Sequence, residues 1–363
     1  MNAAAPRLSL LLLLLLLRRP EPMSRLAAAL QTQNRALRAN ILREFETLDA
    51  LRARVPNFTR RSEEHQQLLL DGCTQNERAL TQIFGAEATP TLLERVLPLD
   101  WLPSSSHHPY GGRWDSVSAI YDGLGSVWRH AVKDWSGHAG HELLHGRIVD
   151  ALAAGGAESV LVAGCGQGRL ATRIATALPR ARVVGVEQSE AQLGVARFML
   201  DATAERSVTF HPFLDEARNN ATMETRLHAV AAPDIALSGG PPNLSLRLGS
   251  FDADAAVSAG LGGADAVVAS FFLDCLEDTV AAVEALRACV RPGGLVVFAG
   301  PLAYHHLPTL APTLDGLAAL SGELGLPLVG DLDVVDAPYP ERPGALREES
   351  AWRAGFFVAR RAE

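Results

Sequence analysis

The chain has 363 residues, of which 48% are hydrophobic and 20% are charged, and its formal net charge is −8. A chain of this length can bury a full hydrophobic core, and its composition argues against wholesale disorder. The negative charge provides no global basic field, so nucleic acid is not expected as a partner. The four cysteines form no CxxC pair, so a zinc site built from cysteines is not expected.

The first 22 residues contain an apolar run that bears on the destination of the protein. Residues 8–17 are all leucine apart from Ser9, and two arginines follow directly. This run is shorter than the roughly 20 residues that span a bilayer, but it fits a signal-peptide core of roughly 7–15 residues. The arginines stand where a small-residue cleavage site is expected. We therefore interpret residues 1–22 as a leader or as an extension upstream of a working start at Met23. No membrane span is expected, the expected location is cytoplasmic or nuclear, and secretory targeting by residues 8–17 stays open.

Residues 23–125 are predicted to form a helical N-terminal region. Apolar residues recur at three-, four- and seven-residue steps over 26–48, which predicts a helix that ends before Pro56. A second helix is predicted over 62–84. Residues 104–112 are rich in turn formers and are predicted to be a loop.

Residues 126–363 are predicted to form one α/β domain. It begins with a predicted helix over 126–153, which ends at Gly155 and Gly156. Short β-branched runs then alternate with helical stretches. The predicted strands cover 159–164, 181–187, 207–213, 244–251, 265–270 and 294–300, and the predicted helices between them cover 168–178, 189–204 and 278–289. This alternation predicts a doubly wound, mostly parallel, Rossmann-like sheet. The proline- and glycine-rich residues 231–242 are interpreted as an insertion before the fourth strand.

A glycine-rich turn follows the first predicted strand. Gly164, Gly166 and Gly168 form a GxGxG pattern at the start of a predicted helix, where backbone N–H groups can approach a ligand closely. Glu187 closes the second predicted strand, where an acid can accept hydrogen bonds from both hydroxyls of a ribose. Dinucleotide-binding proteins carry GxGxxG, but Arg169 stands at the place of their third glycine. The pattern therefore favours S-adenosylmethionine (SAM) over NAD as the cofactor.

Several further motifs resemble those of the carnosine N-methyltransferase family from Val127 to the C-terminus. Lys133-Asp134-Trp135-Ser136 resembles the family's R-D-W-S segment, residues 160–170 its VPGAGLGRL loop, Glu187-Gln188-Ser189 its N-E-W-S turn, Asn219-Asn220 its paired asparagines, residues 270–274 its CFFID segment and residues 300–305 its GPLLYH segment. The glycine loop alone would be unspecific, but these segments in this order are specific for the family.

The resemblance implies a SAM-dependent methyltransferase domain with added N-terminal helices. The implied reaction methylates the imidazole of carnosine, giving anserine, or of a related histidine-containing dipeptide. Asp274 and His305 are implied as catalytic residues, which bind the substrate's amino group and its imidazole or carboxylate region. The other substrate-binding residues implied are Phe272, Asn219, Asn220 and Tyr339. The cofactor-binding residues implied are His130, Lys133, Gly164, Gly166, Gly168, Glu187, Ser250, Phe251 and Ser270, and no metal ligand is implied.

Three positions depart from the family pattern. Lys133, the single lysine among 33 Lys and Arg residues, stands where the family has an arginine, so the contact with the cofactor carboxylate loses a bidentate fork. His130 stands in place of a glutamine, and Ser250 in place of an acid. In addition, the last aromatic residues of the tail are reduced to Trp352, which bears more on the identity of the substrate than on the chemistry.

An acid at position 274 suits the chemistry of imidazole methylation. A neutral imidazole nitrogen is nucleophilic, whereas a protonated imidazole is not. A carboxylate can hold the correct tautomer and stabilise the cation that forms, as it does for a catalytic histidine. Asp274 closes a predicted parallel strand, at the edge where doubly wound sheets bind ligands.

His141-Glu142-Leu143-Leu144-His145 is a literal HExxH motif and indicates a second enzyme class. In zinc metalloproteases this spacing places two histidine ligands on one helical face, with the glutamate as general base. Ile148 and Ala151 stand where the extended motif has glycine and a third histidine. We therefore keep the zinc protease as a remote alternative and interpret His138, His141 and His145 as a solvated or lightly buried helix face.

Two further alternatives stay open. The methyl acceptor could be another small amine, a peptide or a histidine of a protein, and the fold could serve for binding alone. A small-molecule or dipeptide substrate is the expected partner, and a homodimer is left open.

Overall fold

A computed structural model describes residues 22–46, 51–85, 123–137, 141–203, 207–249, 251, 261–305, 310–337, 345–346 and 353–363. Residues 1–21 of the predicted leader and the loop over 104–112 lie outside these ranges, as do Ser250 and Tyr339. Within the described part of the chain, no helix is both long and apolar enough to cross a membrane.

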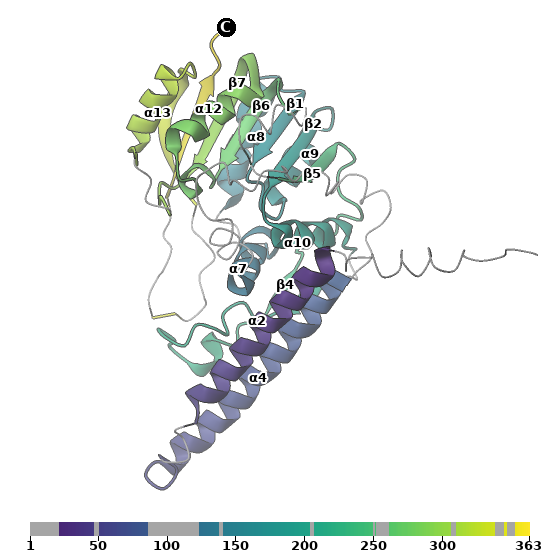
Figure 1. The fold of residues 1–363 in the computed structure, drawn as a ribbon, viewed down its shortest axis with the longest axis vertical. Helices are drawn as coiled ribbons and strands as arrows, with labels where there is room; N and C mark the ends of the chain where they lie inside the picture. Colours follow the sequence, from purple (N-terminus) through teal and green to yellow (C-terminus); the bar gives the residue numbers. More distant parts are fainter. Residues whose placement is uncertain are drawn as a thin grey trace, which may run out of the picture.

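The centre of the molecule is a seven-stranded sheet with the order β5-β2-β1-β6-β7-β9-β8 (Figure 1). Its strands are β1 (Ser159–Ala163), β2 (Arg182–Glu187), β5 (Leu244–Leu248), β6 (Ala264–Ser270), β7 (Val290–Gly300), β8 (Leu328–Asp336) and β9 (Arg353–Arg360). The first five are mutually parallel, whereas β9 is antiparallel to both β7 and β8. The predicted Rossmann-like α/β fold is therefore confirmed, with β8 and β9 added beyond the predicted strands.

Helices cover both faces of this sheet because successive side chains of a strand point to opposite faces. Val160 and Val162 of β1 belong to one apolar core, and Leu161 and Ala163 belong to another. The first core is completed by α7 (Leu124–Trp135), α8 (Glu142–Ala154), α9 (Arg169–Ala177) and α10 (Glu190–Asp201). The second is completed by α12 (Thr279–Cys289) and α13 (Leu314–Glu323).

The predicted strand over 207–213 does not belong to the main sheet, and that prediction is wrong. Only Val208–Phe210 forms a strand, β3, and it pairs antiparallel with β4 (Val230–Ala232) in a separate two-stranded sheet. Phe210 stacks on Trp128 of α7 at 4.5 Å between ring centroids. Packing against α7 therefore draws this apolar run away from the sheet. The predicted insertion over 231–242 begins inside β4.

The predicted single helix over 126–153 is also wrong, because α7 and α8 are separate. Ser136 leaves helical geometry and Gly137 has φ +73°, a left-handed conformation that ends helices. The carbonyl of Trp135 accepts a hydrogen bond from the N–H of Asp234 at 2.8 Å instead of continuing the helix. The predicted end at Gly155 and Gly156 is confirmed.

The N-terminal helices form a hairpin that projects away from the sheet (Figure 1). It consists of α2 (Pro22–Glu44) and α4 (Pro56–Gly85), so the second helix begins six residues before its predicted start at 62. Leu30 and Ile41 of the predicted apolar stripe are fully buried. Asn76 of α4 donates a hydrogen bond to the carbonyl of His211, which ties the hairpin to the segment after β3.

Candidate active site

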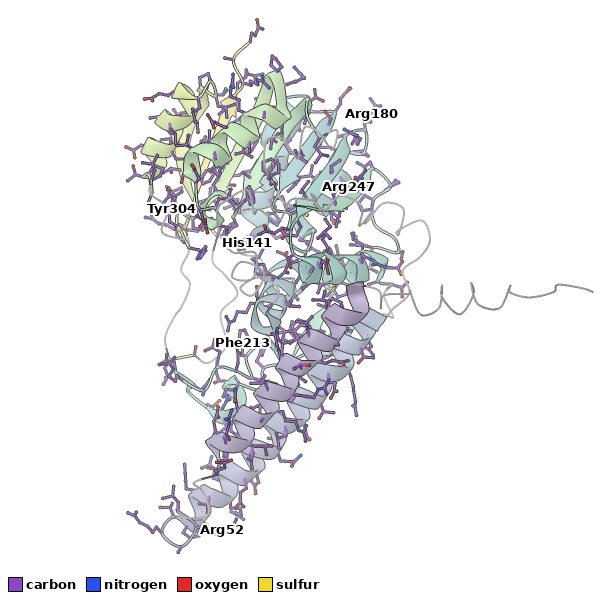
Figure 2. The ribbon with its side chains drawn as sticks, in the orientation of Figure 1. Arg52, His141, Arg180, Phe213, Arg247 and Tyr304 are labelled. Atoms are coloured by element: carbon purple, nitrogen blue, oxygen red, sulfur yellow. The ribbon has the colours of Figure 1, made fainter. Side chains whose placement is uncertain are left out.

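One cleft of about 530 Å³ lies at the carboxyl ends of the parallel strands. Residues that follow β1, β2, β5, β6 and β7 line one side of it, and residues of α7 and the start of α8 line the other. His141 and Tyr304 mark this end of the sheet in Figure 2. Open α/β sheets bind ligands at this edge, and the volume is in the range of small-molecule sites.

The cleft brings together most of the residues predicted from the sequence. Those that line it are His130, Lys133, Gly164, Gly166, Glu187, Phe251, Ser270, Phe272, Asp274 and His305. Gly168 belongs to the same loop but lies behind the lining, as the N-cap of α9. Ser250 and Tyr339 lie outside the described residues, so their predicted contacts stay predictions.

Asn219 and Asn220 are predicted to bind the substrate, but neither residue lines the cleft. Asn219 has φ +59°, and its carbonyl accepts a hydrogen bond from the N–H of Leu346 at 2.8 Å. Asn220 forms a bridge with Ala345, and its side-chain amide donates to the carbonyl of Glu216 at 3.0 Å. In the described residues this pair therefore holds a C-terminal segment.

The glycine loop adopts a conformation that side chains rarely tolerate. Gly164, Gly166 and Gly168 have φ values of +60°, +54° and +81°. A Cβ at Gly164 would lie 2.3 Å from Cδ2 of Phe272, so this glycine leaves space that the aromatic ring fills. The Phe272 ring in turn meets Phe251 edge-on, with centroids 5.6 Å apart. Glycine is therefore required here both by the backbone and by the packing of one wall of the cleft.

Two backbone N–H groups hold the carboxylate of Glu187. Oε2 accepts a hydrogen bond from Gly166 N–H and Oε1 accepts one from Ser189 N–H, each at 2.9 Å. The acid at the end of β2 is thus clamped to the glycine loop of β1. Each carboxylate oxygen has two lone pairs, so a single hydrogen bond does not exhaust the acceptor capacity of that oxygen.

One face of α7 lines the cleft with titratable groups that the helical repeat brings together. Lys133 Nζ donates to Asp134 Oδ1 at 2.5 Å. Burial opposes ionisation of Asp134, but the neighbouring ammonium outweighs it, and the pKa of Asp134 lies below its usual range. Burial, together with Lys133, lowers the pKa of His130, and the Nδ1 of His130 lies 2.8 Å from the carbonyl of Ser126.

His141 and His145 are buried in the wall of the cleft, so the prediction of a solvated or lightly buried helix face is wrong for these two residues, whereas His138 lies outside the described residues. Their exposed fractions are 3% and 6%, and their ring centroids lie 6.0 Å apart. The His141 ring also packs on Phe271 at 4.8 Å. They are drawn inward because the chain breaks before α8, which places His141 at the N-cap of that helix and turns both rings towards the cleft.

The geometry around the HExxH motif does not favour the zinc protease. Glu142 forms ion pairs with Arg173 and Arg169 of α9, so the carboxylate of the expected general base is turned towards two guanidinium groups. In the described part of the chain, no group of three histidine, cysteine or acidic side chains is placed to hold a metal ion. The two histidines instead belong to the wall of the cleft.

We expect His145 to make the protein sensitive to acid. Burial, helped by Lys133, lowers the pKa of His145 from 6.5 to about 4, so unfolding takes up a proton between these two pH values. Stability then falls as the pH drops from 6.5 to 4, by on the order of 3 kcal/mol from this residue. Denaturant unfolding at pH 7 and pH 4 should show a correspondingly smaller loss for His145→Leu than for the unmodified protein.

The same comparison contains its own control. His130, whose pKa is also lowered by burial, is present in both proteins and cancels from the difference. Nδ1 of His145 is buried and has no hydrogen-bond partner among the described residues, so the leucine variant should lose nothing from that atom at pH 7. Equal acid sensitivity in the two proteins would contradict the prediction.

Asp274 lies at the opposite wall, in the short helical turn η4 (Leu273–Cys275) after β6. It is 2% exposed, and its Oδ2 accepts a hydrogen bond from Ala303 N–H at 3.1 Å. Nε2 of His305 is 4.0 Å from the same oxygen, and the N–H of His305 donates to the carbonyl of Asp274 at 2.9 Å. These contacts hold the loop after β7 against the end of β6.

Burial raises the pKa of Asp274, and the hydrogen bond from Ala303 and the nearby His305 only partly oppose it. Burial and the Asp274 carboxylate together raise the pKa of Tyr304 to about 12, so its hydroxyl stays protonated. The side chain of His305 is 53% exposed, whereas that of Asp274 is enclosed. The pair therefore joins a desolvated carboxylate to an imidazole in contact with solvent.

Phe271 departs from ordinary backbone geometry next to Asp274. Its φ is +52°, and its N–H donates to the carbonyl of Ala299 at 2.8 Å. A Cβ at Gly300 would lie 2.9 Å from the backbone nitrogen of Phe271, so the chain passes closely at this point. Strained residues of this kind persist where the surroundings hold them, and they are common at functional sites. The strain helps to aim Phe272 and Asp274 into the cleft.

Sequence reasoning assigned no site role to several polar residues of the lining, among them Asp134, His141 and His145. Asp134 follows His130 by four residues on a helix, so the helical repeat could have placed both on one face. No comparable signal was available for the two histidines, because their placement depends on the break between α7 and α8.

The comparisons with known proteins agree on one family. A family model described as carnosine N-methyltransferase matches residues 118–363, which is more than half of the chain. Carnosine N-methyltransferase unmet of Drosophila melanogaster is 24% identical over 252 residues, which cover 65% of this chain and 54% of that protein. Carnosine N-methyltransferase of Mus musculus is 25% identical over 197 residues, which cover 51% of this chain and 48% of that protein. The chain thus spans about half the length of the curated relatives it matches.

Solved methyltransferase structures resemble the chain more loosely. Magnesium protoporphyrin IX methyltransferase from Synechocystis with bound SAM superposes with a TM-score of 0.42 and 16% identity, over 68% of this chain and 96% of that one. The N-methyltransferase NodS from Bradyrhizobium japonicum superposes with a TM-score of 0.37 and 15% identity, over 63% of this chain and 99% of that one.

Proposed function

Because the chain belongs to the carnosine N-methyltransferase family, whose cofactor is SAM, we propose that it methylates the imidazole of carnosine or of a related histidine-containing dipeptide. The observation that carries the proposal is the buried carboxylate of Asp274 beside His305, in the same cleft as the glycine loop. A carboxylate in this position suits an acceptor whose ring carries one nucleophilic nitrogen and one N–H group.

The residues of the cleft fit SAM. A Cβ at Gly166 would meet a single atom within 4 Å, Oδ2 of Asp134 at 3.8 Å, so the loop is open at this residue. Glu187 closes β2, where a carboxylate can accept hydrogen bonds from the hydroxyls of a ribose. Phe251 and Phe272 offer apolar surface for the adenine, and Lys133 offers a cation for the carboxylate of the amino-acid end. When bound, SAM supplies a methyl group activated by a positively charged sulfur.

Asp274 and His305 then have complementary tasks. The carboxylate of Asp274 accepts a hydrogen bond from the N–H of the substrate imidazole, which leaves the other ring nitrogen with a free lone pair. That nitrogen forms the new bond to the methyl carbon as the carbon–sulfur bond breaks, and the ring becomes cationic. The anionic carboxylate stabilises this charge and accepts the N–H proton. His305, which contacts both Asp274 and solvent, passes the proton to water.

The test is a direct assay for product. The purified protein with SAM and carnosine should form anserine together with S-adenosylhomocysteine (SAH), detected by mass spectrometry. Formation of methylated product from other imidazoles, with none from carnosine, would reject the substrate and keep the class of reaction. Absence of product from every imidazole acceptor, in protein that still binds SAH, would reject imidazole methylation.

A further inference from the structure

In the ion pair between Lys133 and Asp134 of α7, one carboxylate oxygen of Asp134 retains acceptor capacity. Asp134 is 7% exposed, and its Oδ1 accepts the hydrogen bond from Lys133. Oδ2 accepts no hydrogen bond from the part of the chain that the structure describes. A Cβ at Gly166 would lie 3.8 Å from Oδ2, so this oxygen stands over the glycine loop at a residue without a side chain. Both residues line the cleft.

Asp134 lines the cleft, where a largely desolvated carboxylate oxygen favours contact with a cation or a donor. Two of the imidazoles near Asp134 supply no charge for this contact. Lys133 serves Oδ1, and burial lowers the pKa of both His130 and His145, so these imidazoles are neutral at physiological pH. Since Lys133 keeps Asp134 ionised despite its burial, Oδ2 offers a negative charge to the cleft.

We propose that Asp134 binds the α-ammonium group of SAM, while Lys133 binds the α-carboxylate. The two partners of the ion pair would together bind the zwitterionic amino-acid end of the cofactor. This inference rests on the proposed use of SAM, and it adds a residue that the family resemblance does not assign. A carboxylate of the ligand is repelled by Oδ2, whereas an ammonium donates to it in a charge-assisted hydrogen bond. The position over Gly166 places this contact beside the loop that follows β1.

The competing explanation is that Asp134 only orients Lys133. In that case the amino group of the ligand would be dispensable, and removing the charge of Asp134 would matter only through the lysine. The proposal requires the α-amino group of the ligand for tight binding, whereas the competing explanation requires only the α-carboxylate.

Calorimetric titration of the full chain with two ligands tests whether Asp134 acts on the amino-acid end of the cofactor, and a ligand that lacks only the α-amino group then separates the two explanations. SAH carries the amino-acid end, and 5′-methylthioadenosine lacks it but keeps the adenosine and the sulfur. Asp134→Asn should bind SAH about 10- to 100-fold more weakly, from the loss of one charge-assisted contact, and should bind 5′-methylthioadenosine within about twofold of the unmodified protein. Asp150→Asn, an exposed acid of α8, is the matched control and should leave both affinities unchanged.

Equal weakening of both ligands in Asp134→Asn would show a general structural defect and overturn the proposal, as would unchanged SAH binding. A second measurement needs no variant. An SAH analogue in which hydrogen replaces the α-amino group should bind the unmodified protein about 10- to 100-fold more weakly than SAH. Equal affinity would reject Asp134 as the ammonium partner. Neither titration uses a methyl acceptor, so both results are independent of whether carnosine is the substrate.

Discussion

Asp274→Asn is expected to reduce kcat for methyl transfer on the order of 10³-fold, while SAH binding stays within about twofold. The substitution keeps the shape of the side chain, and the amide oxygen can still accept the hydrogen bond from Ala303 N–H. It removes the negative charge that we propose stabilises the methylated ring and takes up its proton. The loss should therefore fall on turnover of the bound substrate.

Rates at saturating carnosine and SAM, together with SAH affinity by calorimetry, provide the measurement. Asp150→Asn, the exposed acid of α8, should behave as the unmodified protein in both assays. If Asp274→Asn retained full kcat, Asp274 would have no part in the reaction. If it lost SAH binding to the same degree as turnover, the effect would be structural.

Gly164→Ala is expected to destabilise the protein by about 2–5 kcal/mol and to abolish measurable SAH binding. A left-handed backbone costs a side chain roughly 1–2 kcal/mol, and overpacking adds about 1–3 kcal/mol. The new Cβ would meet the Phe272 ring at 2.3 Å, and that ring is already held against Phe251. The ring must therefore move into the space that we assign to the cofactor.

Two other glycines separate the contributions in thermal and denaturant unfolding. Gly263 has φ +79° but a Cβ there would meet no atom within 4 Å, so Gly263→Ala reports the backbone cost alone. Gly146 of α8 also has open space around it, and Gly146→Ala should stabilise the helix by about 0.5–1 kcal/mol. A Gly164→Ala variant as stable as Gly263→Ala would show that Phe272 yields freely, against the expectation.

Local patterns were sufficient to predict the half of the cleft that the strands provide. Gly164, Gly166, Glu187 and Asp274 each directly follow or close a strand whose apolar run is visible in the chain. Because parallel strands end at one edge of a sheet, identifying the strands is enough to bring these residues together. The lining of the cleft agrees with that reasoning.

The α7 and α8 half of the cleft could not be predicted in the same way. One helix was predicted over 126–153, but it is divided by a break that depends on Gly137 and on a hydrogen bond from Asp234, which lies about a hundred residues further on. That break buries His141 and His145. The strand over 207–213 was misplaced for the same reason, since Phe210 pairs with Trp128 and not with the sheet.

By itself, the sequence determined the Rossmann-like class, the glycine loop and the acids at the strand ends, because periodicity and spacing report interactions between near neighbours in the chain. Only the tertiary structure decided that Lys133, the single lysine, is bound to Asp134, and that Asp134 stands over Gly166. Lys133 and Asp134 are neighbours in the chain, but their position over Gly166 depends on contacts between segments far apart in the chain, whose free energy no local pattern records. Lys133, which stands where the family has an arginine, therefore belongs to a buried ion pair that suits a zwitterionic ligand.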